Sequence, residues 1–130
     1  KAAELNIKPL VRVVATASAS VEPRIMGIGV VPAVKRVLKL ANMTADDIDL
    51  WELNEAFAAQ FLACNRELKL DPDKINVNGS GISLGHPVGS TGLRILVTVI
   101  YELKRRNKKY ACASLCAGGG PAMATIIEVL

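Results

Sequence analysis

Apolar segments rich in β-branched residues alternate with amphipathic helical segments along this chain, and that alternation most restricts its fold. We predict strands over residues 10–17, 48–53, 74–77, 111–115 and 122–129. Apolar positions recur at helical spacing over residues 31–41, 55–68 and 91–106, and a short capped turn begins at Thr44. Strands that alternate with helices predict a mostly parallel sheet between helical layers. Only the last two strands, joined by glycines, are expected to pair as an antiparallel hairpin.

The expected architecture is an α/β domain in the order β-α-β-α-β-α-β-β, with a mostly parallel, five-stranded mixed sheet and helices on both faces. The 130 residues suffice for one domain, residues 1–130, with a sizeable core. The apolar residues expected to face inward lie on the second and third helices: Phe57, Phe61, Leu62 and Leu68, and Leu93, Leu96, Val97, Ile100 and Leu103.

Composition excludes several classes of protein. No apolar run approaches the ~20 residues of a membrane helix. The three cysteines, an odd number, argue against a disulfide framework and favour a reducing, cytoplasmic location. The net charge of +4 is concentrated at residues 104–109, where either a solvated helix end or a phosphate-binding patch would explain it. Because no aromatic residue interrupts that run, we expect no nucleic-acid partner.

Two glycine-rich loops carry the residues best suited to chemistry. The only histidine, His86, lies in the loop of residues 78–92, and Cys116 opens a turn of three consecutive glycines, 118–120. Glycines let backbone N–H groups approach a ligand closely. A buried structural histidine and an ordinary strand end are the alternatives, and the third glycine exceeds what a hairpin needs. One histidine and so few other soft ligands predict no metal site.

These loops are expected to meet at one edge of the sheet. Residues 21–27, 54–57, the His86 loop and Cys116 each follow a predicted strand, and catalytic groups gather at the carboxyl ends of parallel strands. Asn54 opens the second of these segments, where it can serve the site, cap the following helix, or both. The sequence therefore predicts a single site built from four segments.

The three motifs Asn-Glu-Ala-Phe (54–57), Gly-His-Pro (85–87) and Cys-x-Gly-Gly-Gly (116–120) occur here in the order and spacing of the thiolases. From about Lys8 to Leu130 the chain resembles the C-terminal domain of that family, which includes the acetyl-CoA acetyltransferases and 3-ketoacyl-CoA thiolases of fatty-acid metabolism. The resemblance implies an acyltransferase that uses coenzyme A thioesters as substrates and requires no cofactor. It implies no membrane or metal partner.

The resemblance also implies a role for each matching residue. Cys116 would be the base that removes an α-proton from acetyl-CoA, and His86 would activate a nucleophilic cysteine and donate to the thioester oxygen. Asn54 would hold a water in the same oxyanion hole, and the backbone N–H of Gly118 would hold the acyl-enzyme carbonyl. The acyl pocket would be lined by Met26 and Phe57. Donors aimed at an enolate oxygen and a base at the α-carbon are what Claisen chemistry requires. A neighbouring imidazole can depress the pKa of a cysteine thiol, which would let Cys116 act as a base at neutral pH.

Some features depart from the family pattern. The acylated cysteine of thiolases belongs to an N-terminal domain that these residues do not include, and neither Cys64 nor Cys112 has the setting of a nucleophile. Cys112 either packs in the core or faces the pocket wall. Ser80 and Gly81 stand where Gly-Ala is usual, and Pro121 where Gln or Met is common.

We therefore expect the C-terminal half of an acetyl-CoA C-acetyltransferase, seen as a piece of a longer protein and inactive alone. The alternative is a free-standing domain that binds acyl-thioesters or a partner chain without catalysis. The expected partners are the acyl-CoA substrate, the thiolase N-terminal domain, and a second copy bound through the apolar stripe of the third helix.

Overall fold

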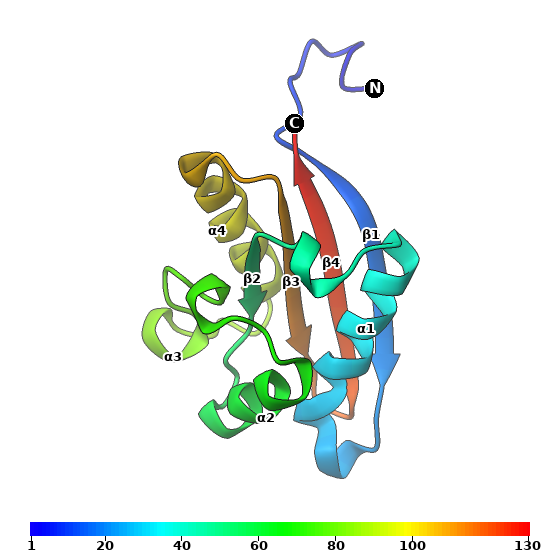
Figure 1. Cartoon of the computed structure of the whole chain (residues 1–130), viewed down its shortest axis with the longest axis vertical. Helices are drawn as coiled ribbons and strands as arrows, with labels where there is room; N and C mark the ends of the chain where they lie inside the picture. Colours follow the sequence, from blue (N-terminus) through cyan, green and yellow to red (C-terminus); the bar gives the residue numbers. More distant parts are fainter.

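The computed structural model describes all 130 residues and contains one four-stranded sheet in the order β1-β4-β3-β2. The strands are β1 (Val11–Ser20), β2 (Leu50–Leu53), β3 (Tyr110–Cys116) and β4 (Pro121–Val129). β4 pairs antiparallel with both β1 and β3, and β2 pairs parallel with β3. As the arrows in Figure 1 show, β1, β2 and β3 consequently run in one direction, so their carboxyl ends share one edge of the sheet.

The α/β class and the β3–β4 hairpin are confirmed, but the number of strands and their pairing differ from the prediction. Only the β2–β3 pairing is parallel, because β4 inserts between β1 and β3. The expected strand at 74–77 is absent. Ile75 makes a single bridge to Trp51, and Asn76 then turns the chain with a left-handed φ of 47°. The Asn76 side chain bonds both the N–H and the carbonyl of Leu53, at 2.9 and 2.8 Å, which caps the strand end.

The helices are α1 (Val30–Ala41), α2 (Ala58–Leu68), α3 (Gly81–Leu84) and α4 (Thr91–Arg106). Short 3-10 turns cover Pro23–Gly29, Ala45–Asp47 and Pro72–Lys74. α1 packs on β1, β3 and β4, whereas α4 packs on β2 and β3 and contributes to a separate apolar cluster. Figure 1 shows α1 and α4 on opposite sides of the sheet, so the prediction of helices on both faces is confirmed. None of the helices has the length and apolarity to cross a membrane.

Several residues predicted to face inward are exposed. On α2 the buried residues are Gln60 and Cys64, while Phe57 and Leu62 are 61% and 63% exposed. Residues 55–57 also precede the helix, which begins at Ala58. The core-facing line of α4 runs through Ile95, Val99 and Leu103, with Leu96 and Ile100 half-buried. Leu93, Val97 and Tyr101 form an exposed apolar stripe on its outer side.

The basic run of residues 104–109 begins in the last turn of α4 and behaves as a helix end. Glu102 accepts hydrogen bonds from Arg105 and Arg106, and Lys108 and Lys109 form ion pairs with Asp49 and Glu128. Most of these cations already have acidic partners within the fold, which favours a solvated helix end over a phosphate-binding patch.

Candidate active site

A pocket of about 310 Å³ lies at the sheet edge where β1, β2 and β3 end. It receives side chains from the turn after β1, the segment after β2, the His86 loop and the end of β3. The lining residues are Met26, Ala56, Phe57, His86, Val88, Leu115, Cys116, Ala117 and Gly118. All four segments predicted to converge therefore do so, and five of the six predicted site residues line the pocket.

The contacts of Thr91 favour one tautomer of the His86 ring. The Thr91 hydroxyl donates its only hydrogen to the carbonyl of Pro87 at 3.0 Å, and its oxygen lies 2.7 Å from His86 Nδ1. That oxygen must therefore accept from Nδ1–H. In the neutral ring this leaves Nε2 unprotonated, with a lone pair that can take a proton. Thr91 is fully buried in the first turn of α4, so it anchors the ring to a rigid element.

The side chain of Asn54 contacts the His86 ring. Asn54 is fully buried just after β2, and its backbone N–H bonds the carbonyl of Ser114 on β3 at 3.0 Å. Its Nδ2 lies 3.5 Å from His86 Nε2, close enough for a weak hydrogen bond to that lone pair. Asn54 does not cap α2, because the helix begins four residues later with Phe57 at its N-cap position. The capping alternative was thus wrong, and the contact with His86 is what the structure gives this side chain.

Glu55 holds the loop that carries His86. Its carboxylate accepts from Asn76 Nδ2 and from the backbone N–H of Ile82, both at 3.2 Å. The close approach leaves no room for a larger residue at Gly81, because a Cβ there would lie 2.4 Å from the carbonyl oxygen of Glu55. In this chain, the packing against Glu55 therefore leaves room only for glycine at position 81.

Cys116 ends β3 with its side chain in the pocket, and it is only 7% exposed. Burial raises the pKa of the Cys116 thiol, outweighing a backbone hydrogen bond that lowers it. No hydrogen bond joins the thiol to His86, so the expectation that the imidazole depresses this pKa was wrong. Cys116 rests as a thiol and holds a proton that it can give away.

The other two cysteines are structural. The Cys64 thiol is buried and donates to the carbonyl of Gly27 at 3.3 Å. Cys112 is wholly enclosed in the core, and burial raises the pKa of its thiol to about 12. Neither residue lines the pocket, so Cys112 takes the packed alternative.

The three glycines after Cys116 differ in what requires them. Gly119 and Gly120 have φ values of 93° and 107°, and a Cβ on Gly120 would lie 2.2 Å from the carbonyl oxygen of Val21. At Gly118 a Cβ would meet nothing within 4 Å, and the residue lines the pocket. The turn therefore requires the last two glycines, while the first leaves backbone exposed to a ligand.

Met26 and Phe57 both lie on the wall of this pocket, and their role in acyl binding stays a prediction. Sequence reasoning missed the apolar wall residues Ala56, Val88, Leu115 and Ala117. It also missed Thr91, whose position at a predicted helix start, five residues after the histidine, was the available signal.

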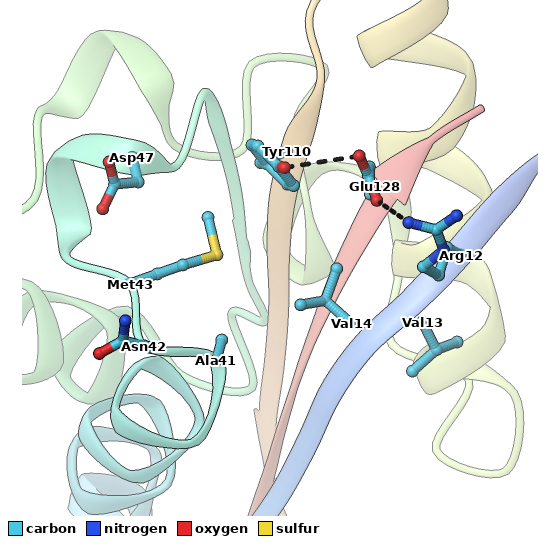
Figure 2. Close-up of a pocket in the computed structure, with 9 residues that line it drawn as sticks. All are labelled: Arg12, Val13, Val14, Ala41, Asn42, Met43, Asp47, Tyr110 and Glu128. Atoms are coloured by element: carbon cyan, nitrogen blue, oxygen red, sulfur yellow. Dashed lines mark hydrogen bonds and ion pairs between the residues drawn. The ribbon is translucent and has the colours of Figure 1, made fainter.

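A larger hollow of about 460 Å³ lies at the opposite end of β3, beside Tyr110 (Figure 2). Its charged side chains already have partners in the fold. Arg12 donates to Glu128 at 2.9 Å, the Tyr110 hydroxyl donates to the same carboxylate, and Asp47 accepts from the backbone N–H of Thr44. None of the three charged side chains that line this hollow is therefore left without a polar partner.

Comparison with known proteins identifies the family of this chain. The family model described as "Thiolase, C-terminal domain" matches residues 7–129 of the chain. The chain belongs to the thiolase family. An acetyl-CoA acetyltransferase from Syntrophomonas wolfei is 52% identical over 132 residues, covering 100% of this chain and 33% of that protein. This thiolase domain thus spans about a third of the length of the curated relatives it matches.

Solved thiolase structures share the fold of this domain. The acetyl-CoA acetyltransferase of Bacillus anthracis superposes with a TM-score of 0.96 at 53% identity, covering 99% of this chain and 33% of that one. The human mitochondrial 3-ketoacyl-CoA thiolase in complex with CoA gives 0.97 at 48% identity, with the same coverage. The resemblance drawn from the three sequence motifs is confirmed.

Proposed function

We propose that this chain supplies the acid/base half of an acetyl-CoA C-acetyltransferase active site, for Claisen condensation or thiolysis of acyl-CoA. The observation that carries the proposal is the grouping of Cys116, His86 and Gly118 around one apolar pocket, with Asn54 on His86 Nε2. In this proposal the nucleophilic cysteine comes from an N-terminal thiolase domain, because none of the three cysteines here combines exposure with an activating base.

The protonation states of the two groups fit the first half-reaction. His86 Nε2, unprotonated in the ring held by Thr91, takes the proton of the nucleophilic thiol. The thiolate attacks the thioester carbonyl, the C–S bond to coenzyme A breaks, and the resting Cys116 thiol gives its proton to the departing coenzyme A thiolate. The imidazolium Nε2–H, the water held by Asn54 and the Gly118 N–H stabilise the oxyanions.

The second half-reaction uses the charges left by the first. The Cys116 thiolate takes an α-proton from a second acetyl-CoA, and the enolate carbon attacks the acyl-enzyme carbonyl. A C–C bond forms, the C–S bond to the nucleophilic cysteine breaks, and that cysteine recovers its proton from His86 Nε2. Cys116 gains an α-proton in place of the one it gave to coenzyme A, and His86 and the nucleophilic cysteine also regain their starting protonation states, so the cycle needs no cofactor. Met26 and Phe57 line the acyl pocket in this scheme.

Complementation is the direct test. The 130-residue chain alone should show no condensation or thiolysis above background, and adding a thiolase N-terminal domain in trans should restore turnover. Acyl transfer by the chain alone would contradict the proposal and point to Cys64 or Cys112. Binding of an acyl-thioester without turnover after complementation would favour a non-catalytic binding domain.

Two substitutions in the complemented enzyme separate the roles. Cys116→Ser should abolish condensation and deuterium exchange into the methyl group of acetyl-CoA, while acylation persists because coenzyme A thiolate leaves readily. His86→Ala should impair both half-reactions. Cys112→Ser, in the enclosed core, is the control and should retain both. Normal deuterium exchange in Cys116→Ser would refute the assignment of the base.

A further inference from the structure

A buried charged cluster lies beside the site, and the proposed reaction gives it no task. Glu52, on β2, is 2% exposed, and its carboxylate lies 3.9 Å from the guanidinium of Arg94 on α4. Arg94 also donates to the hydroxyl of Ser80, which is fully buried, at 3.4 Å. The three residues come from β2, the loop that carries His86, and α4.

Burying these polar and charged groups lowers the stability that the same space could supply if it were filled by apolar residues. Three buried polar atoms of the cluster have no hydrogen-bond partner: Glu52 Oε2, Arg94 Nε and Arg94 Nη1. The Oδ1 atom of the nearby Asn54 also has none. Burial disfavours the ionised form of the Glu52 carboxyl and raises its pKa to about 7, although attraction by Arg94 acts in the opposite direction. Apolar residues of similar volume often stabilise a fold as well as a buried ion pair does. Stability alone is therefore a poor reason for these residues.

The positions of the cluster relate directly to the site. Glu52 precedes Asn54 by two residues on the same strand end. Arg94 follows Thr91, the partner of His86 Nδ1, by one helical turn. Ser80 precedes the loop residues that lead to His86. The guanidinium thus joins the three segments whose relative placement sets the 3.5 Å contact between Asn54 Nδ2 and His86 Nε2.

We propose that Arg94 is a positioning residue for Asn54 and His86, acting through its contacts with Glu52 and Ser80. The assignment rests on the proposed function for its kinetic consequences. The contact of Arg94 with Ser80 links α4 directly to the segment that leads to His86. A displacement of about 1 Å between catalytic groups lowers the rate on the order of 100-fold. Arg94 can therefore affect the rate without touching the substrate.

The first experiment measures kinetics in the complemented enzyme. Arg94→Met should lower kcat by about 10- to 100-fold and leave KM within about twofold, because orientation is lost and binding is not. Arg94→Lys, which keeps the charge without the planar fork, should recover part of that loss. Ser80→Ala removes one hydrogen bond and should lower kcat about two- to tenfold. Lys104→Met, exposed on the same helix and outside every ion pair, is the control and should match the wild type.

A double variant excludes simple destabilisation. Arg94→Met alone leaves the Glu52 carboxyl buried without its cation, so this variant should lose stability as well as activity. Glu52→Gln/Arg94→Met leaves no buried charge, so its stability should return towards that of the wild type while the loss of kcat remains. Recovery of kcat together with stability would overturn the proposal, because the cluster would then be merely structural.

The second experiment needs no turnover. His86 is the only histidine, so its two ring nitrogens can be followed by NMR without ambiguity. In the wild type at pH 8, Nδ1 should carry the proton and Nε2 should not. In the double variant a mixture of tautomers should appear, while Lys104→Met keeps the wild-type spectrum. An unchanged ring in the folded double variant would overturn the positioning role. Absence of turnover in the complemented wild type would overturn only the proposed function, since the ring signal still decides this inference.

Discussion

Glu52→Gln should make the protein more stable at pH 8, and should have a much smaller effect at pH 5. The carboxyl is 2% exposed, and burial raises its pKa from 4.5 to about 7, with attraction by Arg94 and repulsion by Glu55 as smaller effects. The folded state therefore binds this proton more tightly than the unfolded chain does. Its contribution to stability is fully present below about pH 4.5 and is lost as the pH rises through about 7.

The size of the effect follows from the two pKa values. They differ by about 2.5 (from 4.5 to about 7), and each pH unit is worth about 1.4 kcal/mol, so ionising Glu52 costs the fold up to about 3 kcal/mol. Glutamine resembles the protonated carboxyl in shape and does not titrate. The free energy of unfolding of the variant should thus exceed that of the wild type by a margin that grows between pH 5 and pH 8.

Urea unfolding at pH 5, 6, 7 and 8 measures this margin, with the fluorescence of Trp51 as the probe. Trp51 is the only tryptophan, it is 2% exposed, and it neighbours Glu52. The pKa values of four other carboxyl groups are lowered, so these groups titrate below this pH range: Asp47, Asp49, Glu102 and Glu128. Glu67→Gln, exposed and outside every ion pair, is the control. A margin that stays constant with pH would refute the raised pKa, and a variant less stable at pH 8 would mean that attraction by Arg94 outweighs burial.

Three other outcomes are expected. Gly120→Ala should destabilise the fold by about 2–3 kcal/mol in urea unfolding, because its φ is 107° and the Val21 carbonyl blocks the Cβ. Gly118→Ala should change stability by less than about 0.5 kcal/mol, yet it should lower turnover of the complemented enzyme. Equal destabilisation by the two substitutions would contradict this distinction. Iodoacetamide should alkylate Cys116 slowly at pH 8 and faster as the pH rises, since burial raises the pKa of its thiol, whereas a rate at pH 8 like that of a small free thiol would contradict that burial. The isolated chain should self-associate at micromolar concentration through the exposed apolar stripe of α4, and a monomer of 13.8 kDa by sedimentation equilibrium would argue against it.

Periodicity predicts some elements of this fold closely and fails where side chains replace backbone pairing. The predicted bounds of the last helix, residues 91–106, agree with α4, because its apolar spacing is continuous and Asn107 ends it with a left-handed φ of 51°. The predicted strand at 74–77 is apolar enough, but Asn76 bonds the backbone of Leu53 with its side chain. Nothing in the residue types of that segment distinguishes a side-chain cap from a fifth strand.

The convergence of the four segments at one site was predictable from the sequence, although the predicted number of strands was wrong. The argument needed only that the strands before Met26, Asn54 and Cys116 share one direction, and they do, although β4 separates two of them. The groups that orient the site were not predictable in this way. A threonine at a helix start is typical of a cap, and an arginine three residues later is typical of a solvated helix face.

One signal for the hidden cluster was present in the sequence. Glu52 interrupts the run Leu50-Trp51-Leu53 in a strand expected to be buried, and an acidic residue in such a place needs a partner. Its partner lies 42 positions away, where only the packing of α4 on β2 brings it near. The same limit explains the wrong expectation for Cys116. Sequence places an imidazole near the thiol, but whether attraction or burial controls the pKa depends on how much water reaches the sulfur, and in the folded chain very little does.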